Sequence, residues 1–325
     1  MTVRVGVIGV GVMGADHARK INGSISGAEV SAVADFDAER ATSVAAEMRD
    51  AAVADDGRAL IERDDVDAVV IASHDSTHAE LVHAALAAGK PVMCEKPLAP
   101  TAAECREIIA AQGDRNLITV GFMRRFDPAY NELKRAATPE RIGETLVAHC
   151  VSRNVSAGPG GSEATITNSA IHELDCMPWL LGSPIAEVSW HAGRTSKNSG
   201  PRQDPQIMLL RTESDVLMTV ELFVNARYGY DTRCEIVGET GVASFAVPAH
   251  VIVDSERRRS IEYPLDWVPR YAEAYRLELQ EWVDSIEQGR TSTLADADAG
   301  LRAGLVADAL VESMNNGGRT VTVQY

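Results

Sequence analysis

The sequence predicts an α/β fold of two domains, in which a doubly wound parallel sheet precedes an α+β domain with a mainly antiparallel, open-faced sheet. Over about the first 120 residues, short apolar runs alternate with helical stretches, as in a parallel sheet covered by helices on both faces. Beyond about residue 145, strand candidates follow one another through short turns, as in antiparallel sheets. We place the change near Gly121–Asp127, which divides the chain into domains of residues 1–121 and 122–325. A length of 325 residues suits two domains of ordinary size.

The elements of the first domain are predicted from apolar runs bounded by cap and turn residues. The run that ends at Ala72 is continuously apolar, as in a strand buried on both faces. Asp37 is a predicted N-cap, and Gly89 is a predicted helix end. The predicted strands cover Val3–Ile8, Glu29–Ala34, Val66–Ala72, Pro91–Cys94 and Leu117–Val120. The predicted helices cover Gly14–Asn22, Asp37–Met48, Thr77–Ala88 and Thr101–Ala111.

The second domain is predicted from alternating strands and three amphipathic helices. Residues 213–215 and 238–241 are expected to form hairpin turns. Two stretches rich in Gly, Ser and Pro, residues 156–162 and 193–205, are expected to be mobile loops. The predicted strands cover Thr145–Arg153, Glu187–His191, Gln206–Arg211, Val216–Val224, Arg233–Val237, Val242–Val247 and Thr320–Gln324. The predicted helices cover Ala170–Leu181, Arg270–Gln288 and Asp296–Ser313.

Composition and charge exclude several classes of protein. A net charge of −16 argues against nucleic-acid and anionic-membrane partners, because both require clustered Lys and Arg. The sequence has no apolar run of transmembrane length and no secretory signal pattern, so a cytoplasmic protein is expected. The five cysteines form no C-x-x-C pair, and no His/Asp/Glu cluster has metal-ligand spacing. We therefore expect buried thiols and no metal.

A dinucleotide-binding motif occupies the first strand–helix junction. Gly9, Val10, Gly11, Val12, Met13 and Gly14 fit the pattern G-x-G-x-x-G, and Asp35 follows at the end of the second strand. The glycines allow pyrophosphate to approach the backbone at a helix N-terminus. Asp35 would bind the adenosine ribose and repel a 2′-phosphate, which favours NAD over NADP. The alternative is a Rossmann-like domain whose glycines serve only packing.

A second signature lies at the carboxyl end of the strand from Pro91. Glu95, Lys96 and Pro97 stand where open α/β sheets bind their ligands. A lysine there can reach a nicotinamide ribose and a substrate hydroxyl, and Pro97 can fix the loop through a cis bond. Taken alone, Lys96 is better interpreted as an exposed lysine at a strand end.

These residues together resemble the Gfo/Idh/MocA family of NAD(P)-dependent oxidoreductases over nearly the whole chain. The resemblance rests on GVIGVGVMG, CEKPLA and GFMRRFD. It narrows to the inositol dehydrogenase branch through GFMRRFDPAY (121–130), SRN (152–154), IHELD (171–175), DPQI (204–207) and VNARYGYDTRCEIVGETG (224–241). The resemblance implies NAD-dependent oxidation of a secondary ring hydroxyl of myo-inositol, or of a close cyclitol, to the ketone. It also implies a homotetramer that buries the open sheet face.

The resemblance implies roles for individual residues. His172 would be the general base that takes the hydroxyl proton, and Lys96 would hydrogen-bond the same oxygen. Arg124, Asn154 and Asp175 are expected near the polyol. Tyr228 and Tyr230 would wall the pocket or reach a neighbouring subunit's site, with core packing as the equal alternative. Residues implied on the cofactor, besides the glycine-rich turn, are Ser73, His74, His78, Glu95 and Lys96. His78 is equally compatible with a plain helix residue, and His17 is expected to be structural.

One position departs from the family pattern. Inositol dehydrogenases usually carry Asp four residues before this His, whereas this chain has Asn168. Asn168 can orient the His172 ring without supplying negative charge, or it can cap the following helix. In a helix from Ala170, the spacing places Asn168, His172 and Asp175 on one face. The departure leaves open a dehydrogenase of another sugar or aminocyclitol. A separate alternative is a non-catalytic NAD-binding regulator, which the presence of Lys96 and His172 argues against.

Overall fold

The chain forms two units in the computed structural model, which describes residues 2–245 and 251–325. The first unit combines Met1–Met123 with Glu273–Arg302, and the second combines Arg124–Ala272 with Ala303–Tyr325. The first unit therefore includes a segment from far along the chain. A division of the chain at one point, such as the predicted one between residues 121 and 122, does not describe this arrangement.

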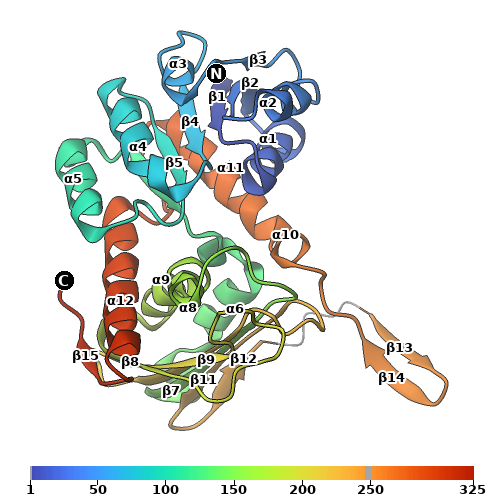
Figure 1. The fold of residues 1–325 in the computed structure, drawn as a ribbon, viewed down its shortest axis with the longest axis vertical. Coiled ribbons are helices and arrows are strands. Elements are labelled where there is room, and N and C mark those ends of the chain that lie inside the picture. Colours follow the sequence, from blue (N-terminus) through green and yellow to red (C-terminus); the bar gives the residue numbers. More distant parts are fainter. Residues whose placement is uncertain (1, 246–250) are drawn as a thin grey trace. The chain divides into compact units, whose positions relative to one another are not determined.

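A parallel sheet of six strands forms the centre of the first unit (Figure 1). The strand order is β3-β2-β1-β4-β5-β6, as in doubly wound folds. Every predicted strand of this domain is present, and only the two-residue strand β3 was not predicted. Central strands such as β4 are buried along their whole length, which explains their uninterrupted apolar runs. The strands are β1 (Val3–Ile8), β2 (Ala28–Ala34), β3 (Ala52–Val53), β4 (Ala68–Ile71), β5 (Val92–Glu95) and β6 (Ile118–Gly121).

Two predicted helices of this unit begin at residues whose side chains cap them. Asp37 accepts a hydrogen bond from the Arg40 amide, and Thr101 with Glu104 forms a capping box. The helix predicted to end at Met48 ends at Ala45, and the short helix α3 was not predicted. The helices are α1 (Val12–Ser24), α2 (Ala38–Ala45), α3 (Gly57–Ile61), α4 (His78–Ala87), α5 (Ala102–Gln112) and α11 (Ala272–Gln288).

Helix α11 joins the first unit through both polar and aromatic contacts. The Tyr275 ring packs edge-on against His17 of α1, and the Gln280 amide bonds the backbone of Ser26. Glu281 binds the loop that follows the helix, since it accepts hydrogen bonds from Arg290 and from Thr293. The hydrogen bonds from Arg290 lower the pKa of Glu281 to about 2.

The hydrogen bonds of Glu281 with Arg290 and Thr293, which we call the Glu281 clamp, predict a pH-dependent contribution to stability. Because the folded-state pKa of Glu281 is depressed, its contribution is present above the ordinary carboxyl pKa and is lost as pH falls towards about 2. We expect Glu281→Gln to lower the free energy of unfolding by about 1 kcal/mol at neutral pH. The difference should shrink below about pH 4.5. Urea unfolding of both proteins across this range, with the exposed Glu107→Gln as control, measures it. A difference that stays constant down to pH 3 would contradict the clamp.

A mixed, mostly antiparallel sheet of seven strands forms the second unit. The order is β12-β11-β7-β10-β9-β8-β15, and β10 pairs with β7 in parallel. Both predicted hairpins are confirmed, as β9 with β10 and β11 with β12. The strands are β7 (Thr145–Arg153), β8 (Ile185–His191), β9 (Gln206–Thr212), β10 (Leu217–Phe223), β11 (Asp231–Gly238), β12 (Val242–Ser244) and β15 (Val321–Thr322). Of the predicted strand Val242–Val247, residues 246 and 247 lie outside the described residues.

Helices cover one face of this sheet and leave the other open (Figure 1). In β10, Met218, Val220 and Leu222 are buried, whereas the alternate side chains are accessible. The sequence did not predict α6 or the exposed hairpin of β13 (Ile252–Ser255) and β14 (Arg258–Ile261). The helices are α6 (Pro128–Ala136), α7 (Pro139–Ile142), α8 (Ser162–Ala164), α9 (Ile171–Leu181), α10 (Trp267–Arg270) and α12 (Ala297–Asn315), whose first turns belong to the first unit.

All five cysteines are buried thiols, as the sequence predicts. No helix in the described part of the chain is long and apolar enough to cross a membrane. Within the same residues, no group of His, Cys, Asp or Glu side chains is arranged to hold a metal ion.

Candidate functional site

A cavity of about 580 Å³ lies at the carboxyl edge of the first sheet. Five residues predicted to contact the cofactor line it: Gly9, Gly11, Asp35, Ser73 and His74. They come from the ends of three neighbouring strands, β1, β2 and β4, which is where open α/β sheets bind ligands. The structure thus brings together residues that are up to 65 positions apart in the sequence.

The three glycines of the turn have different tasks. Gly9 has a φ of +81°, and a Cβ there would lie 2.4 Å from the Ser73 backbone. At Gly14 a Cβ would lie 1.8 Å from the Gly9 carbonyl oxygen, so this glycine allows α1 to pack against the turn. Around Gly11, by contrast, nothing lies within 4 Å of the Cβ position, and no side chain caps α1 there. The open space beside Gly11, at the N-terminus of α1, suits a pyrophosphate.

Asp35 connects the second strand to the glycine-rich turn. Its carboxylate accepts hydrogen bonds from the Val10 amide at 2.8 Å and from the Asp37 amide at 2.9 Å. Arg40 pairs with both Asp35 and Asp37, and its guanidinium stacks over the Phe36 ring at 5.3 Å. One cation against two carboxylates leaves a net negative charge, which disfavours a 2′-phosphate.

Phe36 and Arg40, which were not predicted to contact the cofactor, also line the cavity. Phe36 is 96% exposed, which is unusual for a large apolar side chain. Its position directly after the acidic residue of the motif was the signal that could have identified it. With Arg40 it forms a flat surface beside Asp35 that suits an adenine ring.

The residues after β4 divide into cavity residues and a structural histidine. Ser73 shares a hydrogen bond with Thr77, and His74 is exposed beside Ser76. His78 is buried, and its two ring nitrogens lie 2.7 Å from the Pro97 oxygen and 3.1 Å from the Ser73 oxygen. Both nitrogens are therefore engaged with backbone. His78 thus joins two loops, and its contact with the cofactor stays a prediction.

The turn after β5 contains the predicted cis peptide between Lys96 and Pro97. Glu95 is buried and bonds His17 Nε2 at 2.8 Å through Oε1, and its Oε2 accepts from the Lys96 amide at 3.3 Å. Burial acts to raise the pKa of Glu95, but the hydrogen bond and charge of His17 hold it below its ordinary value. Glu95 thus shapes the backbone at Lys96, and His17 is structural as predicted.

The predicted base lies at the junction of two helical forms. Thr165–Ala170 is a π-helical turn that runs without a break from α8 into α9. Asn168 is exposed on this turn, and His172 is half-buried in the first turn of α9. The expectation that Asn168 caps the helix is wrong, because a cap satisfies open amides at a helix start and this coil begins at Ser162. Short π-turns occur frequently at functional sites.

Two further predicted residues are held in buried ion pairs. Asp175 pairs with Arg125 through both carboxylate oxygens. Arg124, 2% exposed, pairs with Glu173 and bonds Tyr130 and Ser152. Burial acts to lower the pKa of Arg124, but Glu173 outweighs it and holds the pKa above its ordinary value. These ion pairs would give Arg124 and Asp175 a structural role even without a substrate. Their contact with a polyol therefore stays a prediction.

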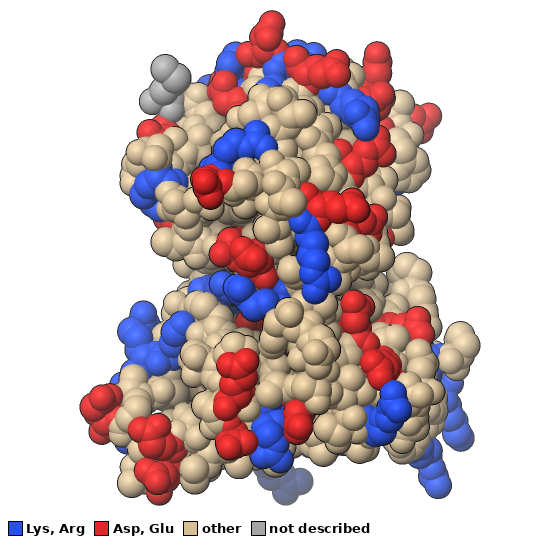
Figure 2. Space-filling view, turned by 90° about the vertical axis from the view of Figure 1, so that its left-hand side faces the viewer, with Lys and Arg blue, Asp and Glu red and all other residues tan. Residues whose placement is uncertain are grey.

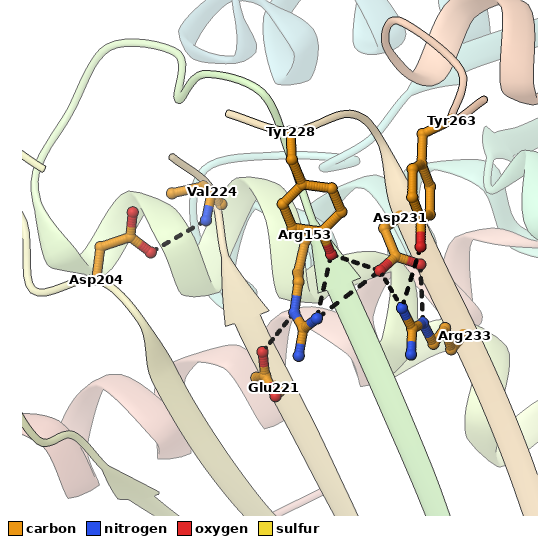
Figure 3. Close-up of polar contacts among 8 residues, drawn as sticks. All are labelled: Arg153, Asp204, Glu221, Val224, Tyr228, Asp231, Arg233 and Tyr263. Carbon is orange, nitrogen blue, oxygen red and sulfur yellow. Dashed lines mark hydrogen bonds and ion pairs between the residues drawn. The ribbon is translucent and has the colours of Figure 1, made fainter. Parts of the chain in front are cut away.

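The remaining predicted residues lie beside strand ends of the second sheet, and Figure 3 shows Tyr228 among them. Asn154 follows β7, and its side-chain oxygen accepts from the Val155 amide. The Tyr228 hydroxyl donates to Asp231 and accepts from Arg153, with its ring 47% exposed. Tyr230 is buried and packs edge-on against Tyr271, which favours the core alternative, and its contact with a polyol stays a prediction.

Charge on the surface is mixed. On the face shown in Figure 2, Lys and Arg side chains are interspersed with Asp and Glu rather than gathered into one basic patch. This distribution differs from the basic stripe typical of nucleic-acid-binding proteins.

Comparison with known proteins identifies relatives for both units. Residues 3–122 match the family described as "Oxidoreductase family, NAD-binding Rossmann fold". Residues 145–323 match the one described as "Oxidoreductase family, C-terminal alpha/beta domain".

Individual relatives match over the full length. Inositol 2-dehydrogenase 2 of Paenarthrobacter aurescens (strain TC1) is 51% identical, with 100% of each chain covered. The crystal structure of a Lactobacillus casei myo-inositol dehydrogenase in complex with NAD(H) and myo-inositol has a TM-score of 0.95 at 31% identity, covering 100% of this chain and 98% of that one. A scyllo-inositol dehydrogenase from the same organism, with bound NAD(H) and scyllo-inositol, has a TM-score of 0.92 at 26% identity, with 99% of each chain covered.

Proposed function

Because this chain belongs to the Gfo/Idh/MocA family of oxidoreductases, with its NAD-binding Rossmann domain, we propose that it is an NAD-dependent inositol 2-dehydrogenase. The observation that carries the proposal is a full-length relative of that name at 51% identity, together with the cofactor cavity formed by Gly9, Gly11 and Asp35. The reaction is the oxidation of one ring hydroxyl of myo-inositol, or of a close cyclitol, to the ketone.

The cofactor and the protein supply different parts of this reaction. NAD, when bound, accepts the hydride from the ring carbon. His172 is the proposed general base, because imidazole is the side chain suited to taking a proton near neutral pH. Lys96 is proposed to hydrogen-bond the hydroxyl oxygen and to stabilise charge that develops on it. Asn154 and Tyr228 are proposed as groups near the polyol, and Asn168 as the group that orients the His172 ring.

A substrate panel tests the proposed function. NAD and NADP reduction is followed at 340 nm with myo-inositol, scyllo-inositol, other inositols, aminocyclitols and aldoses. We expect the highest kcat/KM with NAD and an inositol. Turnover only with an aldose or aminocyclitol would establish the alternative dehydrogenase. NAD binding without reduction by any member of the panel would establish a regulator.

The charge at Asp35 predicts the cofactor preference. Asp35→Asn keeps an oxygen for the Val10 amide but removes the negative charge that opposes a 2′-phosphate. We expect kcat/KM with NADP to rise at least about tenfold and kcat/KM with NAD to fall by a similar factor. The exposed Glu39→Gln, on the same helix as Arg40, is the control. An unchanged ratio of the two cofactors would show that Asp35 does not set the preference.

The residue that departs from the family predicts a pH effect. A carboxylate in place of Asn168 would favour the imidazolium form and raise the pKa of His172. Because the base acts in its neutral form, we expect the acid limb of kcat/KM for Asn168→Asp to move to higher pH. Asn198→Asp in an exposed loop is the control. An unchanged pH profile and an unchanged ranking of cyclitols would contradict a role for residue 168 beside the base.

The proposed compartment is the cytoplasm.

The open face of the second sheet supports a homotetramer. Ile207 and Leu217 project from this face and are 44% and 38% exposed. Apolar side chains on an open sheet are typical of a face buried between subunits. Light scattering at micromolar concentration should give four times the chain mass, and a monomeric mass would reject the assembly.

A further inference from the structure

Arg202 joins the two loops that the sequence predicts to be mobile. It lies in the 193–205 loop and is 5% exposed. Its Nη2 donates to three successive carbonyl oxygens of the 156–162 loop, those of Gly158, Pro159 and Gly160, at 2.9, 3.3 and 2.7 Å. Its Nη1 donates to Thr165 Oγ1 at 2.9 Å, and Thr165 is fully buried. One guanidinium therefore holds both a loop backbone and the first residue of the π-helical turn.

The residues next to Arg202 extend this connection. The Gln203 amide donates to Ser162 Oγ at 2.8 Å, and the Gln206 side chain donates to the Ser162 carbonyl at 3.0 Å. Asp204 is fully buried. It accepts from the amides of Val224 and Asn225, both at 3.0 Å, and Figure 3 shows its carboxylate directed at Val224. We call residues 202–206 the loop clasp.

The loop clasp brings together segments that lie far apart in the sequence. It connects the chain after β7, which contains Asn154, with the chain after β10. The Asn154 amide donates to the Phe223 carbonyl, and the Asn154 carbonyl accepts from the Ala226 amide, so these two chain segments also bond each other. Through Thr165 the clasp reaches the turn that carries Asn168 and leads into His172. The chain segments that carry Asn154 and Asn168 thus share one set of supports.

We propose that Arg202 is a positioning residue that sets substrate specificity, by holding the 156–162 loop and the π-helical turn in the arrangement that fits one cyclitol. This rests on the proposed function. The loop is rich in Gly, Ser and Pro and is exposed from residue 158 to residue 161, so its own packing restricts it little. Four donated hydrogen bonds from one rigid, planar group supply that restriction. Without them the loop and the turn populate several conformations, and discrimination between ring hydroxyls of different orientation is lost.

Kinetics of three variants test the proposal. Arg202→Met keeps the apolar stem and removes all the donors, and Arg202→Lys keeps the charge but cannot bond three carbonyls and Thr165 together. Arg194→Met, an exposed arginine of the same loop, is the matched control. For Arg202→Met we expect KM for the preferred cyclitol to rise at least about tenfold, and its kcat/KM advantage over the next cyclitol to fall at least about fivefold. KM for NAD should stay within about twofold, because the cofactor cavity lies in the first unit. Arg202→Lys should be intermediate.

Hydrogen exchange supplies a readout that does not depend on turnover. Amides of residues 156–170 should exchange at least about tenfold faster in Arg202→Met, whereas the amides of β1 and β4 should be unchanged. Unchanged exchange would overturn the proposal. Faster exchange with unchanged KM and unchanged discrimination would also overturn it, because Arg202 would then be merely structural.

The two failures can be told apart. A wild-type enzyme that reduces NAD with no inositol defeats the proposed function, whatever Arg202 does. An active wild-type enzyme whose Arg202 variants keep its substrate ranking defeats only the inference. If Arg202→Met does not fold, the Arg202→Lys variant carries the same comparison.

Discussion

Replacement of His172 by alanine is expected to lower kcat for inositol oxidation by about 10²- to 10⁴-fold, the usual contribution of a positioned general base. The side chain is half-buried at the start of α9, directly after the π-helical turn, so its removal leaves no large cavity. We therefore expect the melting temperature and the Kd for NAD, measured by fluorescence titration, to remain close to those of the wild type.

The control for this experiment is His83→Ala, which removes a half-buried histidine of α4. It should leave kcat within about twofold. A His172→Ala enzyme that retains more than a tenth of the wild-type kcat would contradict the role of general base. The protein would then have to use another group or solvent to take the proton.

Arg124→Met is expected to lower the free energy of unfolding by about 3–5 kcal/mol, the cost of leaving one member of a buried ion pair without its partner. Arg124 and Glu173 are each 2% exposed, and Glu173 Oε2 has no other hydrogen-bond partner among the described residues. The double variant Arg124→Met/Glu173→Gln removes the uncompensated charge and should recover at least half of the loss. Denaturant unfolding of the three proteins measures these differences.

The double variant also decides between the two roles of Arg124. If its stability recovers and KM for the cyclitol stays near the wild-type value, Arg124 is structural. A recovered stability with a tenfold higher KM would establish the contact with substrate that the sequence predicts. If the free energy of unfolding of Arg124→Met lies within about 1 kcal/mol of the wild-type value, Arg124 and Glu173 do not form a buried ion pair.

Sequence reasoning succeeded where the signal is local. The strands of the first sheet, the glycine-rich turn and the cap at Asp37 all depend on residues within one or two turns of each other. The cofactor cavity followed, because the carboxyl ends of parallel strands meet at one sheet edge.

Features that depend on distant partners could not be predicted in the same way. Arg124 and Glu173 are 49 residues apart, and nothing near either residue indicates the other. The composition of the Gly- and Pro-rich loop predicts mobility. That composition contains no sign of Arg202, which lies some 40 residues later and bonds the loop. The π-helical turn was not predicted for a different reason. A π-turn differs from an α-helical turn by one residue, and the polar and apolar residues of TITNSA show no pattern that distinguishes the two.

The return of Glu273–Arg302 to the first unit constrains how the protein is made. Strand β6, the last strand of the first sheet, is complete once Gly121 has been synthesised. The segment that completes the first unit begins about 150 residues later, which takes roughly 8–30 s at ordinary rates of synthesis. During that interval the partners of Tyr275 and Gln280 on the first unit stay uncovered. The second unit waits in turn for Ala303–Tyr325. Nascent chains stalled anywhere before residue 302 should therefore contain neither unit in finished form, and both should be completed almost together at the end of translation.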